Sequence, residues 1–285
     1  MPELPEVETV RRGLADRLSS FQIQAIEVLR DRAVASPGGV PAFTNALTGS
    51  WVGAWHRRGK YLYANLLDRS TGTTGDLGIW GVHLRMTGQF LWLEEESAPC
   101  HHTRVRMWNS KGEELRFVDV RSFGQMWWVP PGEAPETVMT GLKRLGPEPF
   151  DPQFSGQYLR ERLKGSKRSI KAALLDQSLV AGAGNIYADE SLFAAGIAPQ
   201  TVAGTLTTSR LDTLCHCLVD VLERSIGVGG TTFSDFRDLE GVNGNYGGMA
   251  SVYRRTGKPC QSCGTPIERT RITGRSTHWC PSCQT

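Results

Sequence analysis

The first residues of the chain are of types that could attack an electrophilic carbon. If Met1 is removed, Pro2 carries a free secondary amine and Glu3 places a carboxyl group directly beside it. An amine is a nucleophile when neutral, and an α-amino group has a reference pKa of about 7.7–8.0 against about 10.4 for lysine. The positive end of a helix that begins here would lower the pKa of the Pro2 amine further. The alternative interpretation is an ordinary start codon followed by a capped helix.

Cysteines near the other end of the chain have the spacing of metal ligands. Two C-x2-C pairs are separated by sixteen residues, and their members are Cys260, Cys263, Cys280 and Cys283. In a reducing compartment this spacing favours a tetrahedral structural zinc site over disulfides. Between the pairs, 267–272 alternates like a strand and Gly274 precedes 276–279, which predicts a β-hairpin. We therefore expect a zinc ribbon with one structural Zn²⁺, and unreactive thiols at the isolated Cys100, Cys215 and Cys217.

Several loops carry residue types that suit nucleic acid. Lys60 directly precedes an expected strand, the turn 83–88 has an apolar tip, and the turn 119–124 presents Arg and Phe at alternate positions. The segment 182–185 opens a helix, whose free N–H groups form an anion site. Each feature has an ordinary alternative when taken singly: Met86 and Phe123 as core residues, His83 as a surface histidine, and 182–185 as a plain helix cap.

The elements that must position these residues follow from periodicity. Val7, Val10, Leu14 and Leu18 share one face of a first helix, and Pro5 suits its first turn. Eight short segments rich in aromatic and β-branched residues favour an antiparallel sandwich or barrel; they are 24–29, 51–55, 61–67, 79–84, 90–93, 103–108, 114–118 and 125–129. The stretch 68–78, rich in Gly and Thr, is expected to be a mobile surface loop. After a Pro-rich hinge, helical periodicity covers 154–163, 170–176, 186–195 and 209–226.

The composition is typical of a globular protein, and the basic residues gather in two zones of the chain. The chain has 285 residues, 39% of them hydrophobic, and a formal net charge of +3. The segment 143–171 has eight Lys/Arg against three acids, and 251–285 has six against one. Two basic zones on a nearly neutral chain suggest contact with a polyanion, although a solvated charged surface is the alternative. No apolar run has the length of a membrane span, and no signal peptide is apparent, so we expect a cytoplasmic protein.

Five motifs together make the chain resemble the formamidopyrimidine-DNA glycosylase family of bacteria. They are PELPEVET at 2–9, HLRMTG at 83–88, RSFG at 121–124, AGAGNIYADE at 181–190 and the zinc ribbon with TGRSTHWCPSC at 273–283. They occur in the family's order over essentially the whole chain. The resemblance implies an α+β multidomain fold in which an N-terminal helix and antiparallel β-sandwich are followed by a helix–two-turn–helix domain with a β-hairpin zinc finger. The implied domains are 1–146, a hinge at 147–153, 154–248 and 249–285.

The resemblance implies a base-excision-repair enzyme that removes oxidised purines, 8-oxoguanine and formamidopyrimidines, and then cleaves the strand. In the family's chemistry, the Pro2 amine attacks C1′ of the deoxyribose and forms a Schiff base. Glu3 protonates the ring oxygen. β,δ-Elimination then expels both phosphates, with Lys60 and Arg275 matching positions associated with these steps. The partner is double-stranded DNA containing oxidised bases, and we expect a monomer that binds no membrane and is associated with the bacterial nucleoid.

The remaining residues carried over from the family contact DNA. A base inside a duplex must be extruded before it can react, and the gap must be filled. Met86, Arg121 and Phe123 match the void-filling residues, and Glu190 matches a carboxylate that supports the catalytic end of the site. Further DNA contacts are implied for His83, His102, Lys167, Asn185 and Tyr246, the last in a loop that closes over the flipped base. Ser122 and His101 depart from the family pattern, since many relatives have arginine and lysine there, so we expect weaker backbone contacts at these positions.

Two other functions remain as alternatives at this stage. An endonuclease VIII type enzyme shares the proline chemistry but prefers oxidised pyrimidines; PELPEVET and the Arg121/Phe123 turn favour the purine enzyme over it. A non-catalytic damaged-DNA-binding zinc-ribbon protein would be expected to lack Pro2, Glu3 or Lys60, and all three are present.

Overall fold

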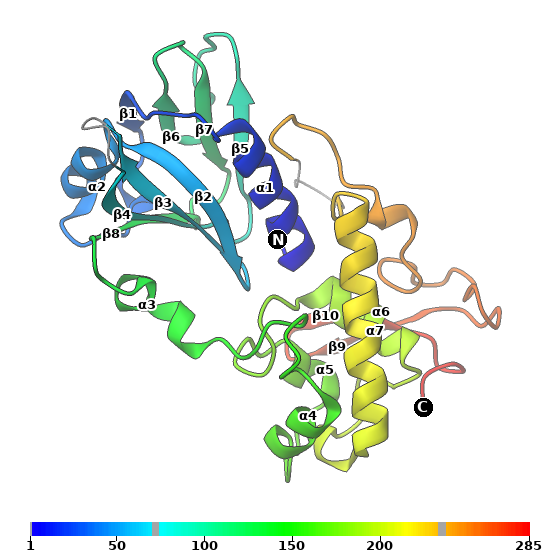
Figure 1. Cartoon of the computed structure of the whole chain (residues 1–285). Helices are drawn as coiled ribbons and strands as arrows, with labels where there is room; N and C mark the ends of the chain where they lie inside the picture. The colour runs from blue at the N-terminus through cyan, green and yellow to red at the C-terminus, as the bar shows by residue number, and fades with distance from the viewer. Residues whose placement is uncertain (1, 70–73, 233–237) are drawn as a thin grey trace. The chain divides into compact units, whose positions relative to one another are not determined.

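The chain folds into two compact units. The computed structural model describes residues 2–69, 74–232 and 238–285. The first unit comprises the residues up to Lys143 together with Gly229–Gly244, and the second comprises Arg144–Val228 together with Asn245–Thr285. The first unit contains the two four-stranded sheets, and the second contains a 20-residue helix and a small two-stranded hairpin (Figure 1).

Two antiparallel four-stranded sheets form the first unit, as the strand pattern predicts. One sheet has the order β2-β3-β4-β8 and the other β1-β6-β7-β5. The strands are β1 (Ala25–Val28), β2 (Trp51–Arg58), β3 (Tyr61–Asp68), β4 (Gly75–His83), β5 (Gly88–Leu93), β6 (Thr103–Trp108), β7 (Glu114–Asp119) and β8 (Gln125–Val129). Buried side chains from both sheets form one hydrophobic core, and Trp80 of β4 packs edge-on against Phe90 of β5 at 6.1 Å. This packing of two sheets over a shared core is a sandwich.

Helix α1 (Leu4–Arg17) confirms the predicted first helix. Val7, Val10 and Leu14 are buried on its inner face, and Leu18 follows directly after its end in the same core. Pro5 lies in the first turn, where a missing N–H leaves no bond unmade. The helix packs against β2 and β3, so the periodic apolar stripe places the start of the chain beside the β2–β3 sheet.

Some elements of the first unit differ from the prediction. The stretch 68–78 was expected to be a loop, but β3 extends to Asp68 and β4 begins at Gly75, and these two residues pair; residues 70–73 lie outside the described residues. Pairing between strands therefore outweighs the Gly and Thr content at both ends of this stretch. The sequence pattern also did not predict α2 (Gly39–Leu47), α3 (Pro135–Val138) or the 3-10 helices η1 (Asp31–Ala33) and η2 (Thr140–Arg144). Short helices carry too few periodic positions to stand out.

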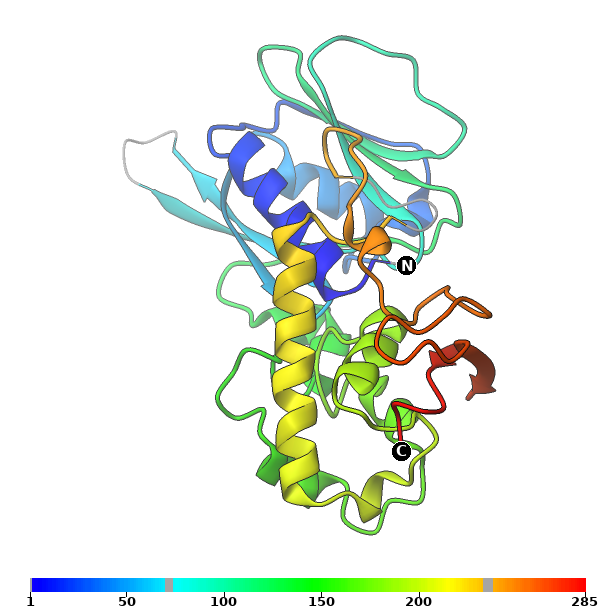
Figure 2. The same cartoon turned by 90° about the vertical axis from the view of Figure 1, so that its right-hand side faces the viewer.

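The second unit is mainly helical. Its α-helices are α4 (Gly156–Arg162), α5 (Ile170–Leu174), α6 (Asn185–Ala194) and α7 (Thr208–Gly227), and its 3-10 helices are η3 (Ala203–Thr205) and η4 (Tyr246–Gly248). The side chains of Ser155, Ser169 and Thr207 cap α4, α5 and α7 by accepting backbone N–H bonds. Figure 2 shows α7 along its 20-residue length; it packs against α4 and α6. The hairpin β9 (Glu268–Ile272) and β10 (Arg275–Trp279) packs on α6 through β10.

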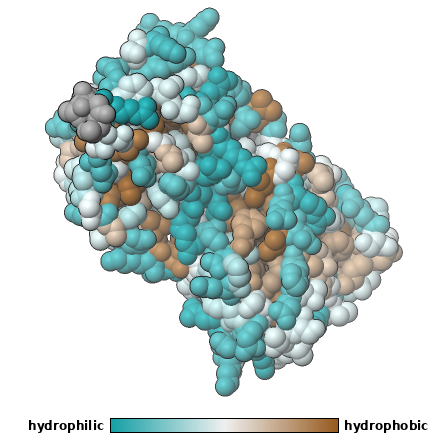
Figure 3. Space-filling model, viewed as in Figure 1, coloured by the Kyte–Doolittle hydropathy of each residue, from teal (hydrophilic) through white to brown (hydrophobic). Residues whose placement is uncertain are grey.

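The surface is mostly hydrophilic in the view of Figure 3, with hydrophobic patches between the polar side chains. Such scattered patches are usual in folded proteins. Among the described residues, no helix has both the length and the apolar character needed to cross a membrane.

Candidate active site and nucleic-acid interface

The N-terminal turn that carries Pro2 and Glu3 is buried, and hydrogen bonds to the side chain of Glu6 hold it in place. Both residues are buried, and the backbone N–H of Glu3 donates to Glu6 Oε2 at 2.8 Å. The other oxygen of the same carboxylate, Glu6 Oε1, accepts from the backbone N–H of Thr231 at 2.8 Å. One buried carboxylate thus fixes the start of α1 to a distant segment of the same unit. The expected removal of Met1 concerns a residue that lies outside the described ones.

A second carboxylate joins α1 to the hairpin that carries Lys60. Glu8 receives bonds from Arg11 and Arg12 of its own helix and from Arg57 Nε of β2 at 3.2 Å. Burial alone would raise the pKa of Glu8, but these hydrogen bonds and the neighbouring guanidinium charges outweigh it and hold the pKa below 4.5. Lys60 lies in the β2–β3 turn and is only 8% exposed. The turn with Lys60 is therefore anchored to the same helix that begins at the candidate nucleophile.

His83 is buried rather than on the surface. Its ring lies edge-on to Tyr61 with centroids 4.5 Å apart, and its Nδ1 accepts the backbone N–H of Arg85 at 2.9 Å. Burial and the positive charges of Arg85 and Lys60 lower the pKa of His83 to about 3. The ring is thus neutral near pH 7, and because Nδ1 is an acceptor, the proton is on Nε2. A neutral Nε2–H donor suits a phosphate oxygen or a sugar oxygen.

Met86, Arg121 and Phe123, the predicted void-filling residues, are the wedge residues, and the turn 119–124 is the wedge turn. The structure brings the wedge turn and the turn 83–88, which carries Met86, side by side. The Asp119 carboxylate is fully buried and accepts a hydrogen bond from the Thr87 hydroxyl of one turn. In the other turn it accepts the backbone N–H of Arg121 at 3.1 Å and that of Gly124 at 2.6 Å. At the tips, Met86 is half-buried, whereas Arg121 and Phe123 are exposed. Phe123 is therefore not a core residue. Sequence reasoning missed Asp119, although its place two residues before Arg121 is typical of an Asx-type turn.

Two backbone conformations in these turns lie in the left-handed region without glycine. Arg85 and Ser122 both have φ of 55°. Such values carry strain in residues other than glycine and asparagine, and they cluster at functional sites. Each stands directly beside a wedge residue, Met86 or Phe123, so the strained backbone sets the direction of the wedge side chains.

The other residues predicted to contact DNA lie in both units. His102 is half-buried beside the wedge turn, where its carbonyl accepts the N–H of Asp119 at 2.9 Å. Lys167 is exposed between α4 and α5, and Arg275 is exposed at the start of β10. Tyr246, predicted to lie in a loop that closes over a base, is buried, with its ring 5.7 Å from that of Tyr187 in the same unit. Residues 233–237 of its loop lie outside the described part of the chain.

Helix α6 anchors two neighbouring segments of the second unit. At its start, Asn185 Nδ2 donates to the carbonyl of Ser276 at 2.9 Å. Further along, the Glu190 carboxylate accepts three consecutive backbone N–H groups at 2.8–2.9 Å, those of Ser251, Val252 and Tyr253. Burial raises the pKa of Glu190, although these three bonds oppose the rise. Glu190 thus fixes the chain that leads into the zinc ribbon, whereas its support of the catalytic end of the site stays a prediction.

A buried ion pair that the sequence analysis missed fixes β10. Lys171 of α5 and Asp189 of α6 are fully buried, with Lys171 Nζ 2.6 Å from Asp189 Oδ1. Lys171 Nζ also donates to Ser276 O and Thr277 Oγ1, both at 2.9 Å, and Asp189 Oδ2 accepts the N–H of His278 at 2.9 Å. The one available signal was a lysine at an apolar position of the pattern SIKAALL. These bonds hold the strand on which Arg275 lies.

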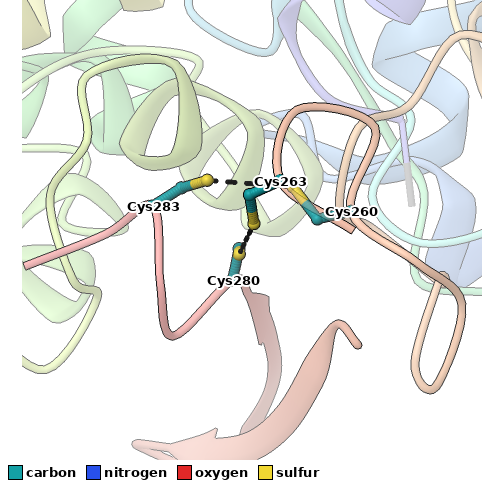
Figure 4. A group of neighbouring side chains, drawn as sticks. All are labelled: Cys260, Cys263, Cys280 and Cys283. Carbon is teal, nitrogen blue, oxygen red and sulfur yellow. Dashed lines mark hydrogen bonds between the residues drawn. The ribbon is translucent and has the colours of Figure 1, made fainter. Parts of the chain in front are cut away.

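The four predicted metal ligands converge at one point. Their sulfur atoms all lie within 4.8 Å of one another, with Cys260 and Cys283 at 3.9 Å and Cys263 and Cys280 at 3.5 Å (Figure 4). A tetrahedral zinc ion with Zn–S bonds of about 2.3 Å separates its ligands by about 3.8 Å. The donor set therefore fits one structural zinc ion with no open position for substrate, which confirms the predicted ligands as a metal-binding cluster.

Family models match three successive parts of the chain. A formamidopyrimidine-DNA glycosylase N-terminal domain matches residues 1–126, and the H2TH domain of the same enzymes matches 145–237. A zinc finger found in FPG and IleRS matches 257–285 and supports the zinc assignment. The order of the three matches is that of the fold described above.

Relatives and solved structures match over the full length. Proteins named formamidopyrimidine-DNA glycosylase from Prochlorococcus marinus and Parasynechococcus marenigrum are 66% and 67% identical, with 100% of both chains covered. A Lactococcus lactis enzyme in complex with DNA containing Fapy-dG is 34% identical with a TM-score of 0.88 over 100% of both chains. A MutM structure with DNA containing carbocyclic 8-oxo-G is 35% identical with the same TM-score and coverage. The chain therefore belongs to the formamidopyrimidine-DNA glycosylase family.

Proposed function

We propose that this chain is a base-excision-repair DNA glycosylase that removes oxidised purines and then cleaves the strand at the abasic site. Relatives more than 65% identical carry the name of this enzyme, and structural neighbours hold DNA with Fapy-dG or an 8-oxoguanine analogue. A further Lactococcus lactis structure holds DNA with an oxidised pyrimidine. That neighbour makes activity on oxidised pyrimidines the second candidate.

The observation that carries the proposal is the buried and anchored N-terminal turn. Glu6 holds the backbone beside Pro2 by two short bonds to N–H groups, and the amine of Pro2, once Met1 is removed, lies at the positive end of α1. In this proposal the amine attacks C1′ as the C1′–N bond to the damaged base breaks. The base leaves with the bonding electrons and takes up the proton that the amine loses. Glu3 donates a proton to the ring oxygen, the ring opens, and an iminium ion forms between Pro2 and C1′.

Strand cleavage follows from the iminium ion. It withdraws electrons, so the C2′ proton becomes acidic and the 3′ phosphate leaves by β-elimination; δ-elimination then releases the 5′ phosphate. Lys60 is proposed to assist these steps and to contact a phosphate, together with Arg275. Lys60 and His83 suit a phosphate contact because both side chains can donate hydrogen bonds to phosphate oxygens. Lys60 supplies the positive charge, and the imidazole of His83 donates as a neutral group.

The remaining contacts hold and open the duplex. Met86, Arg121 and Phe123 are proposed to fill the space left by the extruded base, supported by the Asp119 network. Glu190 supports the site by fixing the segment it binds. Phosphate or base contacts are proposed for His83, His102, Lys167, Asn185 and Tyr246. The same proposal includes domains at 1–146, 154–248 and 249–285, with a hinge at 147–153. It also includes action as a monomer and association with the nucleoid in the bacterial cytoplasm.

Borohydride trapping tests the function. Duplexes with 8-oxoguanine, with an oxidised pyrimidine or with no lesion are incubated with the protein in borohydride, which reduces an iminium ion to a stable adduct. We expect an adduct with 8-oxoguanine DNA, a weaker one with the pyrimidine, and none with intact DNA. Trapping with the pyrimidine alone would favour the second candidate, and no adduct with any lesion would refute the enzyme.

The nucleophile has its own test. Pro2→Gly keeps a terminal amine but makes it primary, and we expect it to slow excision. A form shown by mass spectrometry to retain Met1 should bind lesion DNA but give no adduct. Normal cleavage by that form would refute the assignment of the Pro2 amine.

A further inference from the structure

An exposed aromatic ring in the wedge turn lies beside two guanidinium groups from different parts of the first unit. Phe123 is 39% exposed. The guanidinium carbon of Arg121, two residues earlier, lies over its ring at 4.9 Å from the centroid, and that of Arg32 lies over it at 5.4 Å. Arg32 belongs to η1, far away in the sequence. Both distances are within the range of cation–π attraction.

Arg32 has no other partner that explains its place. Its side chain makes no hydrogen bond or ion pair with any residue in the ranges 2–69, 74–232 and 238–285, although the nearby Asp31 offers a carboxylate. The contact with the Phe123 ring is therefore the side-chain interaction that distinguishes Arg32 from Arg30, the other exposed arginine of this segment.

The backbone that carries Arg32 is fixed independently of the wedge turn. Val34 forms a parallel bridge with Met126, and the N–H of Ala35 donates to Met126 O at 2.8 Å. Ser36 Oγ accepts the N–H of Trp128 at 2.7 Å. The segment after η1 is thus attached to β8, the strand that directly follows the wedge turn. Arg32 thus extends to Phe123 from a segment that is hydrogen-bonded to β8.

The wedge turn itself leaves the Phe123 side chain without such support. Asp119 holds the backbone of the turn through the N–H groups of Arg121 and Gly124. These bonds fix the direction of the Cα–Cβ bond of Phe123 but not the torsions that turn its ring. An exposed side chain that must adopt one rotamer before it inserts loses conformational entropy at that step. A cation held over the ring from a fixed segment restricts the rotamers in advance.

We propose that Arg32 is a positioning residue that holds the ring of Phe123 ready for insertion into the base stack. The inference rests on the proposed wedge function of Phe123. An exposed cation–π contact changes an equilibrium by roughly two- to fivefold, so the removal of Arg32 should slow base extrusion by about that factor. Cleavage of DNA with a preformed abasic site should change less, because no base has to be extruded there.

The test compares Arg32→Ala and Arg32→Lys with the control Arg30→Ala. Arg30 is an exposed arginine of the same segment, so its loss removes the same charge without the ring contact. Single-turnover excision of 8-oxoguanine and the fluorescence of 2-aminopurine placed beside the lesion report extrusion. We expect Arg32→Ala to slow both signals two- to fivefold, Arg32→Lys to restore most of the rate because it keeps a cation, and Arg30→Ala to match the wild type. Equal slowing by Arg32→Ala and Arg30→Ala would overturn the proposal.

A double-mutant cycle with Phe123→Ala separates positioning from direct DNA contact. If Arg32 acts through the ring, Arg32→Ala should have no further effect in the Phe123→Ala protein. If it slows excision equally in both backgrounds and lowers the salt slope of DNA binding by about one, Arg32 contacts a phosphate and the proposal is wrong. If Phe123→Ala alone extrudes and excises normally, the wedge function itself is wrong. Matching thermal unfolding of all variants excludes a folding defect, since both side chains are exposed.

Discussion

The burial of His83 predicts a specific dependence of stability on pH. The ordinary pKa of histidine is 6.5, and in the folded protein that of His83 is lowered to about 3 by burial and by the charges of Arg85 and Lys60. Between these two values the unfolded chain binds a proton at this site and the folded protein does not. Stability from this group is therefore complete above about pH 6.5 and is lost as the pH falls toward 3.

The magnitude follows from the difference between the two pKa values. Each pH unit between them is worth about 1.36 kcal/mol, so at pH 4 the unfolded state has gained about 3 kcal/mol relative to the folded state. A loss of this size is a large part of the total stability of a typical domain, about 5–15 kcal/mol. The first unit should accordingly become the acid-sensitive part of the protein.

Urea unfolding between pH 4 and 8 measures this effect in the wild type and in His83→Gln. Glutamine offers an oxygen acceptor to the N–H of Arg85 but does not titrate, so the difference between the two pH profiles isolates the histidine. We expect the wild type to lose about 3 kcal/mol more than the variant between pH 7 and pH 4. His56→Gln, at an exposed histidine of β2, controls for the loss of an imidazole elsewhere. Parallel profiles, or an NMR titration of His83 with a midpoint near 6, would refute the reasoning.

Three further predictions concern the anchors of the site. Glu6→Gln should lower the free energy of unfolding by about 1–3 kcal/mol, because the NH2 group of glutamine must face one of the two N–H donors, that of Glu3 or that of Thr231. Urea unfolding measures this loss, and borohydride trapping should become slower. Unchanged stability and unchanged trapping would contradict the role of Glu6 as an anchor. Lys171→Met should cost about 3–5 kcal/mol, because the buried Asp189 carboxylate would lose its ion pair with the lysine and, among the described residues, keep only His278 as a partner. In thermal unfolding, the double variant with Asp189→Leu should cost less than the sum of the two single changes; additive losses would argue against a coupled pair. Removal of zinc by a chelator should release one ion per chain and weaken DNA binding in a fluorescence anisotropy assay, while the cleavage product stays the same; a changed product would give the metal a part in the chemistry.

Elements with a strong local pattern could be predicted from the sequence. The apolar stripe of α1, the eight strands and the periodicity of α7 depend on neighbouring residues, so their positions in the structure agree with the pattern to within a few residues. The zinc cluster was predictable for the same reason, since ligand spacing within each C-x2-C pair sets the geometry. The motifs PELPEVET, HLRMTG and RSFG identified the candidate site residues before any contact was known.

The contacts that hold these residues in place became visible only in the folded chain. Nothing local distinguishes His83 from a surface histidine, because its ring is buried against Tyr61 of β3, more than twenty residues earlier in the chain. Glu6, Asp119 and Lys171 each have at least one partner in a distant segment of the chain, namely Thr231, Thr87 and Ser276. A single sequence carries no periodic signal for such pairs.

The N-terminal turn shows where the two sources of information divide. The residue types alone predicted the reactive groups, an amine at Pro2 beside the carboxyl of Glu3, and the helix that begins behind them. Only the tertiary structure showed that this turn is buried and fixed by Glu6 to Thr231, more than two hundred residues away. The physical reason is that reactivity depends on which groups are present, whereas orientation depends on long-range contacts that form only when the chain is folded.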